Sequence, residues 1–204
     1  MKLYYSPGAC SLSPHIALCE AGLPFELEKV DIRAKKLADG SDYTAVNPKG
    51  SVPALKLDDG SVLTEGPAIV QLIADKAKAG QLAPANGTME RYRLQEWLNY
   101  ISTDLHKSFG PLFAPTLGDD AKTFFRERIA KHLGQVDRQL AGKDYLLGSS
   151  FSVADGYLFV VLTWCDRMKI DLSGYPNLVA FKTRVAARPA VQQAMEQEGL
   201  LQKA

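Results

Sequence analysis

Hydrophobic and polar positions change period several times within the first 80 residues. Alternating apolar and polar positions are typical of half-buried strands, whereas apolar positions three to four residues apart indicate helices. The turn Asp58-Asp59-Gly60 separates two short apolar runs, and an Asp-Gly turn of this kind favours a hairpin. We therefore predict strands over 2–6, 24–32 and both arms of 53–64, and helices over 11–21 and 65–74.

The rest of the chain shows helical periodicity and no convincing strand pattern. Residues 80–87 are rich in turn-forming residues and are the best candidate for a linker. The architecture predicted from these patterns is a small α/β domain, 1–80, followed by a larger all-α domain, 87–204. Helices are expected over 89–109 and 125–140, after the capping box Ser152–Asp155, and from 175 to about 188.

Composition excludes several function classes. The chain has 204 residues, of which 46% are hydrophobic and 23% charged, as in an ordinary globular protein and unlike a disordered one. Its 24 Lys and Arg balance 23 Asp and Glu, so charge gives no case for nucleic acid or an anionic membrane as a partner. No apolar run approaches the roughly 18 residues of a membrane span, and the N-terminus lacks a secretory signal, so we expect a cytoplasmic protein.

Cysteine is the residue type most suggestive of chemistry. The three cysteines are scattered and odd in number, which argues against a disulfide scaffold, and neither they nor the three histidines have the spacing of a zinc site. Cys10 lies between the first predicted strand and the first predicted helix. The N-terminus of a helix can lower the pKa of a thiol from about 8.5 to roughly 3.5–7.5. The alternative is a small buried thiol, which is our interpretation of Cys19 and Cys165.

The pattern Cys10-x-x-Ser13 resembles a thioredoxin-type redox motif in which the second Cys is a Ser. Such a site cannot close its own disulfide, because its partner thiol is missing. Any mixed disulfide on Cys10 would therefore need an external thiol to resolve it.

Two loop segments have both a structural and a functional interpretation. Pro53 is either an ordinary proline at the start of a strand, which the sequence by itself favours, or part of a cis bond that exposes the backbone of Val52 to an extended peptide. Glu65 and Gly66 open a helix directly after a strand. They are either an ordinary acidic helix start or a site for an amino-acid head group, with Glu65 accepting from its ammonium.

The long predicted helix 89–109 carries a polar face beside its apolar stripe. Most faces of this kind are simply solvated, and a single His is more often structural than catalytic. Lys35 by itself reads as a solvated loop charge. The polar face consists of Asn99, Thr103 and His106, with Asp104 and Lys107 beside them.

Five short segments stand in a fixed order along the chain: Tyr5-Ser-Pro-Gly-Ala-Cys-Ser-Leu12, Asn47-Pro-Lys-Gly-Ser-Val-Pro53, Leu63-Thr-Glu-Gly66, Ser152-Val-Ala-Asp155, and the tail from Tyr175-Pro-Asn-Leu178 to Arg188-Pro-Ala-Val191. Together they resemble the cytosolic glutathione S-transferases, in particular the bacterial beta class, which has a Cys where other classes use Tyr or Ser. The resemblance covers essentially the whole chain. It implies a thioredoxin-like N-terminal domain, an all-helical C-terminal domain and glutathione as co-substrate, with no metal.

The resemblance also implies roles for individual residues. Cys10 would lie beside the glutathione sulfur, Val52 before a cis Pro53 would pair with the cysteinyl unit, Glu65 and Gly66 would hold the γ-glutamyl head, and Lys35 would reach the glycyl carboxylate. Further groups would approach from the helical domain, some of them from a partner subunit of a homodimer: Asn99, Thr103, Asp104 and His106. The implied catalytic set is Cys10, Tyr5, Ser11 and His106.

Two positions depart from the family pattern. Residue 66 is Gly where the family usually has Ser, so a hydroxyl contact to the head group would be lost. Gly156 follows Asp155 where an apolar residue usually packs against Phe151 as a hydrophobic staple, so we expect a less stable C-terminal domain.

Three hypotheses for the function follow. The first is transfer of the glutathione thiolate to an apolar electrophile, with a detoxifying role and a pocket walled by Phe109, Leu112, Phe113 and Trp164, although Trp164 could equally be plain core. The second is glutathione-dependent thiol–disulfide exchange through Cys10. The third is a non-catalytic protein that binds glutathione or hydrophobic compounds.

Overall fold

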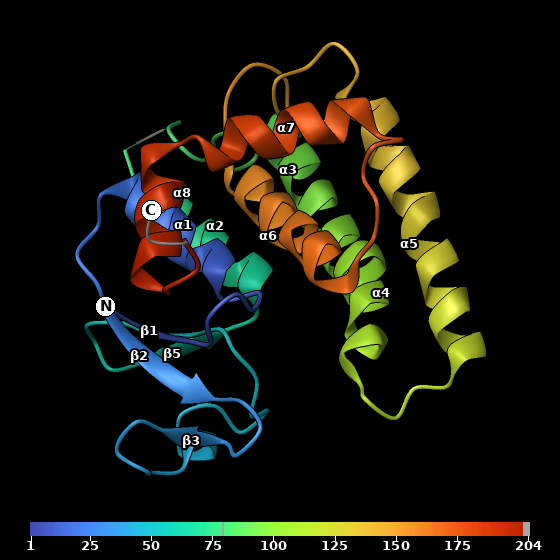
Figure 1. Ribbon diagram of the computed structural model, residues 1–204. Coiled ribbons are helices and arrows are strands. Elements are labelled where there is room, and N and C mark those ends of the chain that lie inside the picture. Colours follow the sequence, from blue (N-terminus) through green and yellow to red (C-terminus); the bar gives the residue numbers. More distant parts are fainter. Residues whose placement is uncertain (79, 202–204) are drawn as a thin grey trace. The chain divides into compact units, whose positions relative to one another are not determined.

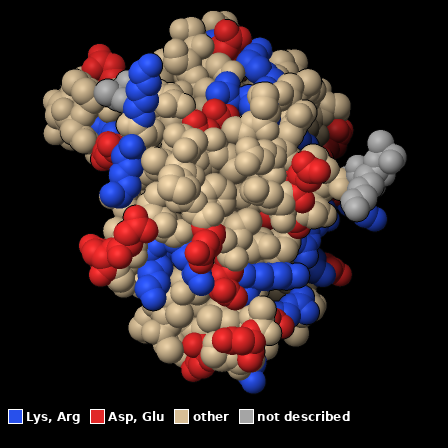
Figure 2. Space-filling view, turned by 90° about the vertical axis from the view of Figure 1, so that its left-hand side faces the viewer, with Lys and Arg blue, Asp and Glu red and all other residues tan. Residues whose placement is uncertain are grey.

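The chain folds into two compact units. The computed structural model describes residues 1–78 and 80–201. One unit consists of residues 1–85 together with the segment from 187 onward, and the other of residues 86–186. Within the described ranges no helix is both long and apolar enough to cross a membrane. On the face of the molecule shown in Figure 2, acidic and basic side chains are interspersed, in keeping with the near-zero net charge.

The first unit is built on a mixed five-stranded sheet with strand order β3-β2-β1-β4-β5 (Figure 1). β1 and β2 run parallel and are joined through helix α1, and the other neighbouring strands are antiparallel. The predicted order of strands and helices is confirmed, and a short strand and a 3-10 helix occupy the connection that the sequence left undefined. The elements are β1 (Lys2–Tyr5), α1 (Leu12–Ala21), β2 (Glu26–Asp31), β3 (Lys36–Leu37), η1 (Tyr43–Ala45), β4 (Ala54–Lys56), β5 (Val62–Thr64) and α2 (Gly66–Lys76).

The sheet is buried on both faces at its centre. Leu3 and Leu55 are register partners and fully buried on one face, because successive side chains of a strand point to opposite sides. On the other face Tyr4 packs against Tyr43 of η1, with ring centroids 5.8 Å apart. Val52 is part of the same hydrophobic cluster as Tyr4 and Tyr43. The loop before β4 is therefore anchored to the core of the sheet.

Helix α8 (Pro189–Gln197) packs against α1 and belongs to the first unit. The sequence pattern assigns residues 87–204 to the helical domain. The structure instead groups the segment from 187 onward with the first unit. Two polar contacts explain the difference. Arg188 makes a two-pronged ion pair with Glu20 at 2.6 and 2.8 Å, and His15 Nδ1 lies 2.9 Å from Glu198 Oε1 with both side chains fully buried.

The second unit is all helical, and its described part contains no strand. A long helical segment starts at Met89 as predicted, but a π-helix, η2, interrupts it in the middle. The predicted helix over 125–140 begins earlier, at Asp119, because Asp119 and Asp120 suit a helix N-terminus. The elements are α3 (Met89–Tyr100), η2 (Ile101–His106), α4 (Lys107–Phe109), η3 (Gly110–Phe113), α5 (Asp119–Leu140), α6 (Val153–Met168) and α7 (Pro176–Ala186).

Helix α6 forms the centre of this unit and is buried throughout its first ten residues, 153–162. Its predicted capping box is confirmed: Asp155 Oδ2 accepts from the backbone and hydroxyl of Ser152, and Oδ1 accepts from Leu146 N at 2.8 Å. Burial raises the pKa of Asp155 to about 6. The hydrogen bonds stabilise the carboxylate and lower the pKa, but their effect is smaller than that of burial. Phe151 is buried and its ring contacts Tyr145, which provides packing in place of the staple that Gly156 cannot make.

The buried cap of α6 predicts a large stability effect. We expect Asp155→Ala to lower the free energy of unfolding by about 3 kcal/mol, because it leaves buried donors of Leu146 and Ser152 without an acceptor. Urea denaturation followed by circular dichroism measures the change. The control is Asp166→Ala on the same helix, whose exposed pairing with Lys182 is worth less than about 1 kcal/mol. Equal effects of the two substitutions would contradict this account of the cap.

Candidate active site

Cys10 lies in a tight loop between β1 and α1. Gly8 has a φ of 68°, in the left-handed region that Gly adopts without strain. The Ser11 hydroxyl closes the loop, accepting from Ser6 N at 3.1 Å and donating to Ser6 O at 3.2 Å. Cys10 Sγ donates to the backbone carbonyl of Val52 at 3.3 Å. The structure therefore brings together the thiol and the loop that precedes β4.

The loop that carries Val52 is fixed from several sides. The Val52–Pro53 peptide bond is cis, as the family resemblance implied. Asn47 Nδ2 and Tyr43 Oη both donate to the carbonyl of Ser51, at 2.7 and 2.9 Å. Because these side chains hold the segment just before Val52, its backbone is presented in one conformation.

Lys35 reaches the same loop from the β2–β3 side of the sheet. Its Nζ donates to the carbonyl of Gly50 at 2.6 Å, and its own backbone has a φ of 59°. The structure thus places Lys35 beside the 47–52 loop, which its sequence neighbours did not indicate.

Glu65 and Gly66 lie at the start of α2. Glu65 has a φ of 71°, an uncommon conformation for a residue with a side chain. Its Oε1 accepts from Lys49 Nζ at 2.6 Å, and Lys49 also donates to the Thr64 hydroxyl at 3.1 Å. Lys49 was not among the candidates from the sequence, because one Lys in a turn-rich loop carries no distinguishing signal.

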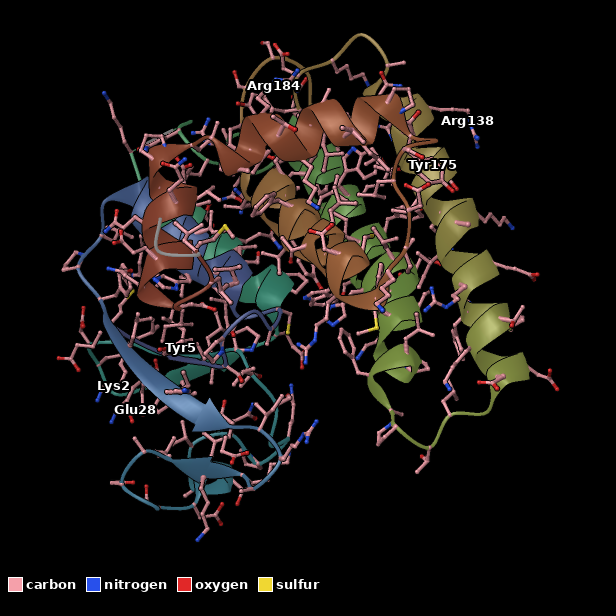
Figure 3. All side chains as sticks on the ribbon, in the orientation of Figure 1. Lys2, Tyr5, Glu28, Arg138, Tyr175 and Arg184 are labelled. Carbon is pink, nitrogen blue, oxygen red and sulfur yellow. The ribbon has the colours of Figure 1, made fainter. Side chains whose placement is uncertain are left out.

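Two further candidates have other partners. Tyr5 ends β1 (labelled in Figure 3) and its ring lies 6.2 Å from that of His15; burial, with a smaller contribution from Glu198, raises its pKa. The single proton of Ser11 goes to Ser6 O, so its hydroxyl holds the loop rather than donating to a sulfur. Tyr5 and Ser11 thus lie near Cys10 in the chain, with His15 and Ser6 as partners.

Of the other two cysteines, Cys165 is buried as expected, whereas Cys19 is partly exposed. Burial raises the pKa of Cys19 to about 11 and that of Cys165 to about 12. The described residues contain no group of three or more His, Cys, Asp or Glu that could hold a metal ion.

The polar face of the long helix separates into two parts in the second unit. The Thr103 hydroxyl donates to Asn99 O at 3.0 Å and lies 2.8 Å from Asp104 Oδ2, so these three residues form one group. Asp104 Oδ1 lies 3.6 Å from Arg128 Nη2 of α5. His106 instead contacts α6, so the structure does not join it to the other three.

His106 sits among aromatic side chains. Its Nδ1 lies 2.6 Å from the hydroxyl of Tyr157, and its ring centroid lies 4.8 Å from that of Trp164. Trp164 also contacts Phe109 and Phe113, so three of the four predicted pocket walls share one cluster. Burial, with a smaller repulsion from Lys107, lowers the pKa of His106 to about 4, so the imidazole is neutral at pH 7. The sequence alone does not select Tyr157, because it lies in the apolar run 157–162, which is typical of a hydrophobic core.

Comparison with known proteins supports one family throughout the chain. Family models of the glutathione S-transferase N-terminal and C-terminal domains match residues 8–76 and 103–198. The chain is 48% identical to the glutathione S-transferase GstA of Escherichia coli O157:H7 over 200 residues, which cover 98% of this chain and 100% of that protein. The chain therefore belongs to the glutathione S-transferase family.

Solved structures agree with this assignment. The ternary complex of BphK, a bacterial GST, superimposes with a TM-score of 0.96 at 62% identity, covering 98% of this chain and 100% of that chain. A sphingomonad glutathione S-transferase complexed with glutathione and a beta class enzyme of Sphingomonas chungbukensis each give a TM-score of 0.95 at 50% identity, with the same coverage. The expected fold, the bacterial beta class resemblance and the prediction of a transferase enzyme are thereby confirmed.

The contrast among the three thiols predicts selective alkylation. Cys10 and Cys19 are both partly exposed, so the contrast between them rests on the raised pKa of Cys19. At pH 7 iodoacetamide should modify Cys10 and leave Cys19 and Cys165 unmodified, because a thiol of pKa 11 or above is about one part in ten thousand thiolate or less. Peptide mapping by mass spectrometry identifies the modified residue. In guanidinium chloride all three should react. Comparable labelling of Cys19 in the folded protein would contradict the interpretation.

Proposed function

We propose that this protein transfers the glutathione thiolate to hydrophobic electrophiles and that Cys10 also supports glutathione-dependent thiol–disulfide exchange. The observation that carries the proposal is the contact of Cys10 Sγ with the Val52 carbonyl, at 3.3 Å, on the loop that ends in a cis Pro53. A backbone held in this way can pair with an extended peptide. The related sphingomonad enzyme, solved with glutathione, supports a tripeptide as that ligand.

Each end of glutathione has matching groups in the first unit. Cys10, Val52 and Pro53 would lie along the cysteinyl unit. Glu65 and the backbone at Gly66 carry the charges and donors that suit the γ-glutamyl ammonium and carboxylate. Lys35 is a cation beside the 47–52 loop and would attract the glycyl carboxylate.

The second unit would supply further groups. We include Asn99, Thr103, Asp104 and His106 in the glutathione-binding proposal, and the aromatic cluster around Trp164 as the apolar wall for the electrophile. Tyr5 stays in the catalytic proposal with Cys10 and His106. Ser11 enters it only as the residue that shapes the loop of Cys10.

The transfer reaction needs a thiolate and a nearby electrophile. Each unit by which a site lowers the glutathione thiol pKa stabilises the thiolate by about 1.4 kcal/mol. Binding the electrophile beside it converts a bimolecular step into an effectively unimolecular one.

The exchange reaction balances with glutathione alone as the reductant. The Cys10 thiolate attacks a glutathione mixed disulfide, the S–S bond breaks, and the substrate leaves as a thiolate while Cys10 keeps the glutathionyl group. A second glutathione thiolate then attacks the glutathionyl sulfur of the mixed disulfide, the bond from that sulfur to Cys10 Sγ breaks, and oxidised glutathione leaves as the Cys10 thiolate is restored. Ser13 cannot take the part of that second thiol, so the external one is required.

A homodimer and a cytoplasmic location are part of the same proposal. Met89 and Tyr92, three residues apart at the start of α3, are exposed apolar side chains that a partner subunit could cover. The alternative to the whole proposal is a non-catalytic protein that binds glutathione or hydrophobic ligands, and turnover decides between them.

Replacing Cys10 separates the two chemistries. After incubation with oxidised glutathione, the wild type should gain one glutathionyl adduct in intact-protein mass spectrometry, and Cys10→Ala should gain none. Disulfide reduction should be lost in Cys10→Ala, whereas conjugation of a chloronitrobenzene should survive, because the transferred thiolate belongs to glutathione. Cys19→Ala is the control and should behave as wild type. An unmodified wild type would remove Cys10 from the site, and no turnover with any electrophile would favour the binding protein.

Gly66 offers a test of the γ-glutamyl end. A Cβ at residue 66 meets only Pro53 Cγ at 4.0 Å, an ordinary contact, so a Ser fits without strain. We expect Gly66→Ser to lower KM for glutathione about 5-fold, since its hydroxyl adds one hydrogen bond of roughly 1 kcal/mol to the head group. Gly66→Ala adds the Cβ without the hydroxyl and is the control. Equal KM values for the two variants would show that this end of the peptide binds elsewhere.

A further inference from the structure

Tyr157 carries a polar group into the buried apolar part of helix α6. It is 3% exposed and lies among consecutive buried residues of α6. A buried phenol hydroxyl needs a hydrogen-bond partner, because leaving it unsatisfied costs about 1–3 kcal/mol. In this structure a partner is Nδ1 of His106, at 2.6 Å.

The length of this bond indicates which atom donates. Bonds with an N–H donor to oxygen usually span about 2.7–3.2 Å, whereas O–H donors reach about 2.5 Å. A separation of 2.6 Å favours the Tyr157 hydroxyl as the donor and Nδ1 as the acceptor. A neutral imidazole that accepts at one nitrogen carries its proton on the other, and the lowered pKa of His106 agrees with a neutral ring.

Packing fixes the plane of the same ring. The His106 ring meets Tyr157 at 84° and Trp164 at 69°, with centroid distances of 5.9 and 4.8 Å. Trp164 is itself buried and contacts Phe109. Because aromatic rings surround the imidazole and Tyr157 contacts Nδ1, the ring is held in one orientation with Nδ1 facing the phenol.

We propose that Tyr157 is a positioning residue that holds His106 in the tautomer protonated at Nε2, so that His106 offers glutathione a neutral hydrogen-bond donor. This inference rests on the proposed function for its ligand. The acceptor would be an oxygen or the thiolate of the peptide. His106 in this state cannot take a proton at Nε2, so it acts by donating a hydrogen bond and not as a general base. In the opposite tautomer Nδ1–H would donate to Tyr157 and Nε2 would be a base.

The protein contains a matched control pair. The hydroxyl of Tyr100 lies 2.8 Å from Nδ1 of His132, with the rings 5.6 Å apart, in the same unit. Neither Tyr100 nor His132 belongs to the proposed glutathione site. Tyr100→Phe therefore removes one tyrosine–histidine bond of the same type while leaving His106 untouched.

Nitrogen NMR of the ¹⁵N-histidine-labelled protein measures the tautomer directly. The chain has three histidines, and His106→Gln assigns the His106 signals by their disappearance. In the wild type we expect His106 to show a protonated Nε2 and an accepting Nδ1. In Tyr157→Phe we expect a mixture of both tautomers, and in Tyr100→Phe no change at His106. A wild-type His106 protonated at Nδ1 would overturn the proposal.

Glutathione binding, measured by calorimetry on the same variants, connects the tautomer to function. We expect Tyr157→Phe to weaken binding roughly 3- to 10-fold, the range of one hydrogen bond, and Tyr100→Phe to leave it unchanged. In a His106→Ala background Tyr157→Phe should have no further effect, because Tyr157 acts through His106. An unchanged affinity in Tyr157→Phe, or an equal loss in the His106→Ala background, would overturn the positioning role.

These readouts do not depend on turnover. A wild type that binds glutathione and shows the expected tautomer, but conjugates no electrophile, would overturn the proposed function and support the role of Tyr157. A wild type that does not bind glutathione would overturn both.

Discussion

The buried contact between His15 and Glu198 connects three segments that are far apart in sequence. One oxygen of Glu198 pairs with His15 of α1, and the other accepts from the backbone of Gly8, at 2.9 Å. Gly8 lies two residues before Cys10, so one carboxylate links the last helix, the first helix and the loop that carries Cys10. Removing one partner of a buried hydrogen-bonded pair usually costs about 1–3 kcal/mol, since it leaves the other polar group unsatisfied. The position of Cys10 thus depends on the C-terminal end of the chain.

Local signals were sufficient to predict much of the fold. The Gly22 stop of α1 adopts a φ of 63°, the Asp-Gly turn forms the β4–β5 hairpin, and Ser152 and Asp155 form the cap of α6. Each of these features depends on residues within a few positions of one another. The attachment of α8 to the first unit could not be predicted in this way, because it depends on contacts over more than 160 residues of sequence, between Glu20 and Arg188.

The candidate site shows the same division. Cys10 and the cis Pro53 have recognisable sequence surroundings, and the structure brings them together. Lys49 and Tyr157 had no such signal, because what distinguishes them is a contact that only the fold supplies, with Glu65 and with His106. A charged side chain in a turn and a phenol in an apolar run look ordinary until their partners are known. Periodicity also grouped His106 with Asn99 and Thr103, whereas η2 directs it to α6 and directs Asp104 to α5.

The π-helix η2 has a geometric consequence for the whole helical segment from Met89 to Phe109. A π-turn closes hydrogen bonds from residue i to i+5, so it adds backbone to one turn without ending the helix. The apolar residues Leu98, Ile101, Leu105 and Phe109 follow each other at spacings of 3, 4 and 4, and all are buried. A regular helix of about 3.6 residues per turn also brings residues at these spacings onto one side, so the apolar seam itself does not require the π-turn. Within the wide turn, two polar side chains only two residues apart reach different helices: Asp104 meets Arg128 of α5, and His106 meets Tyr157 and Trp164 of α6.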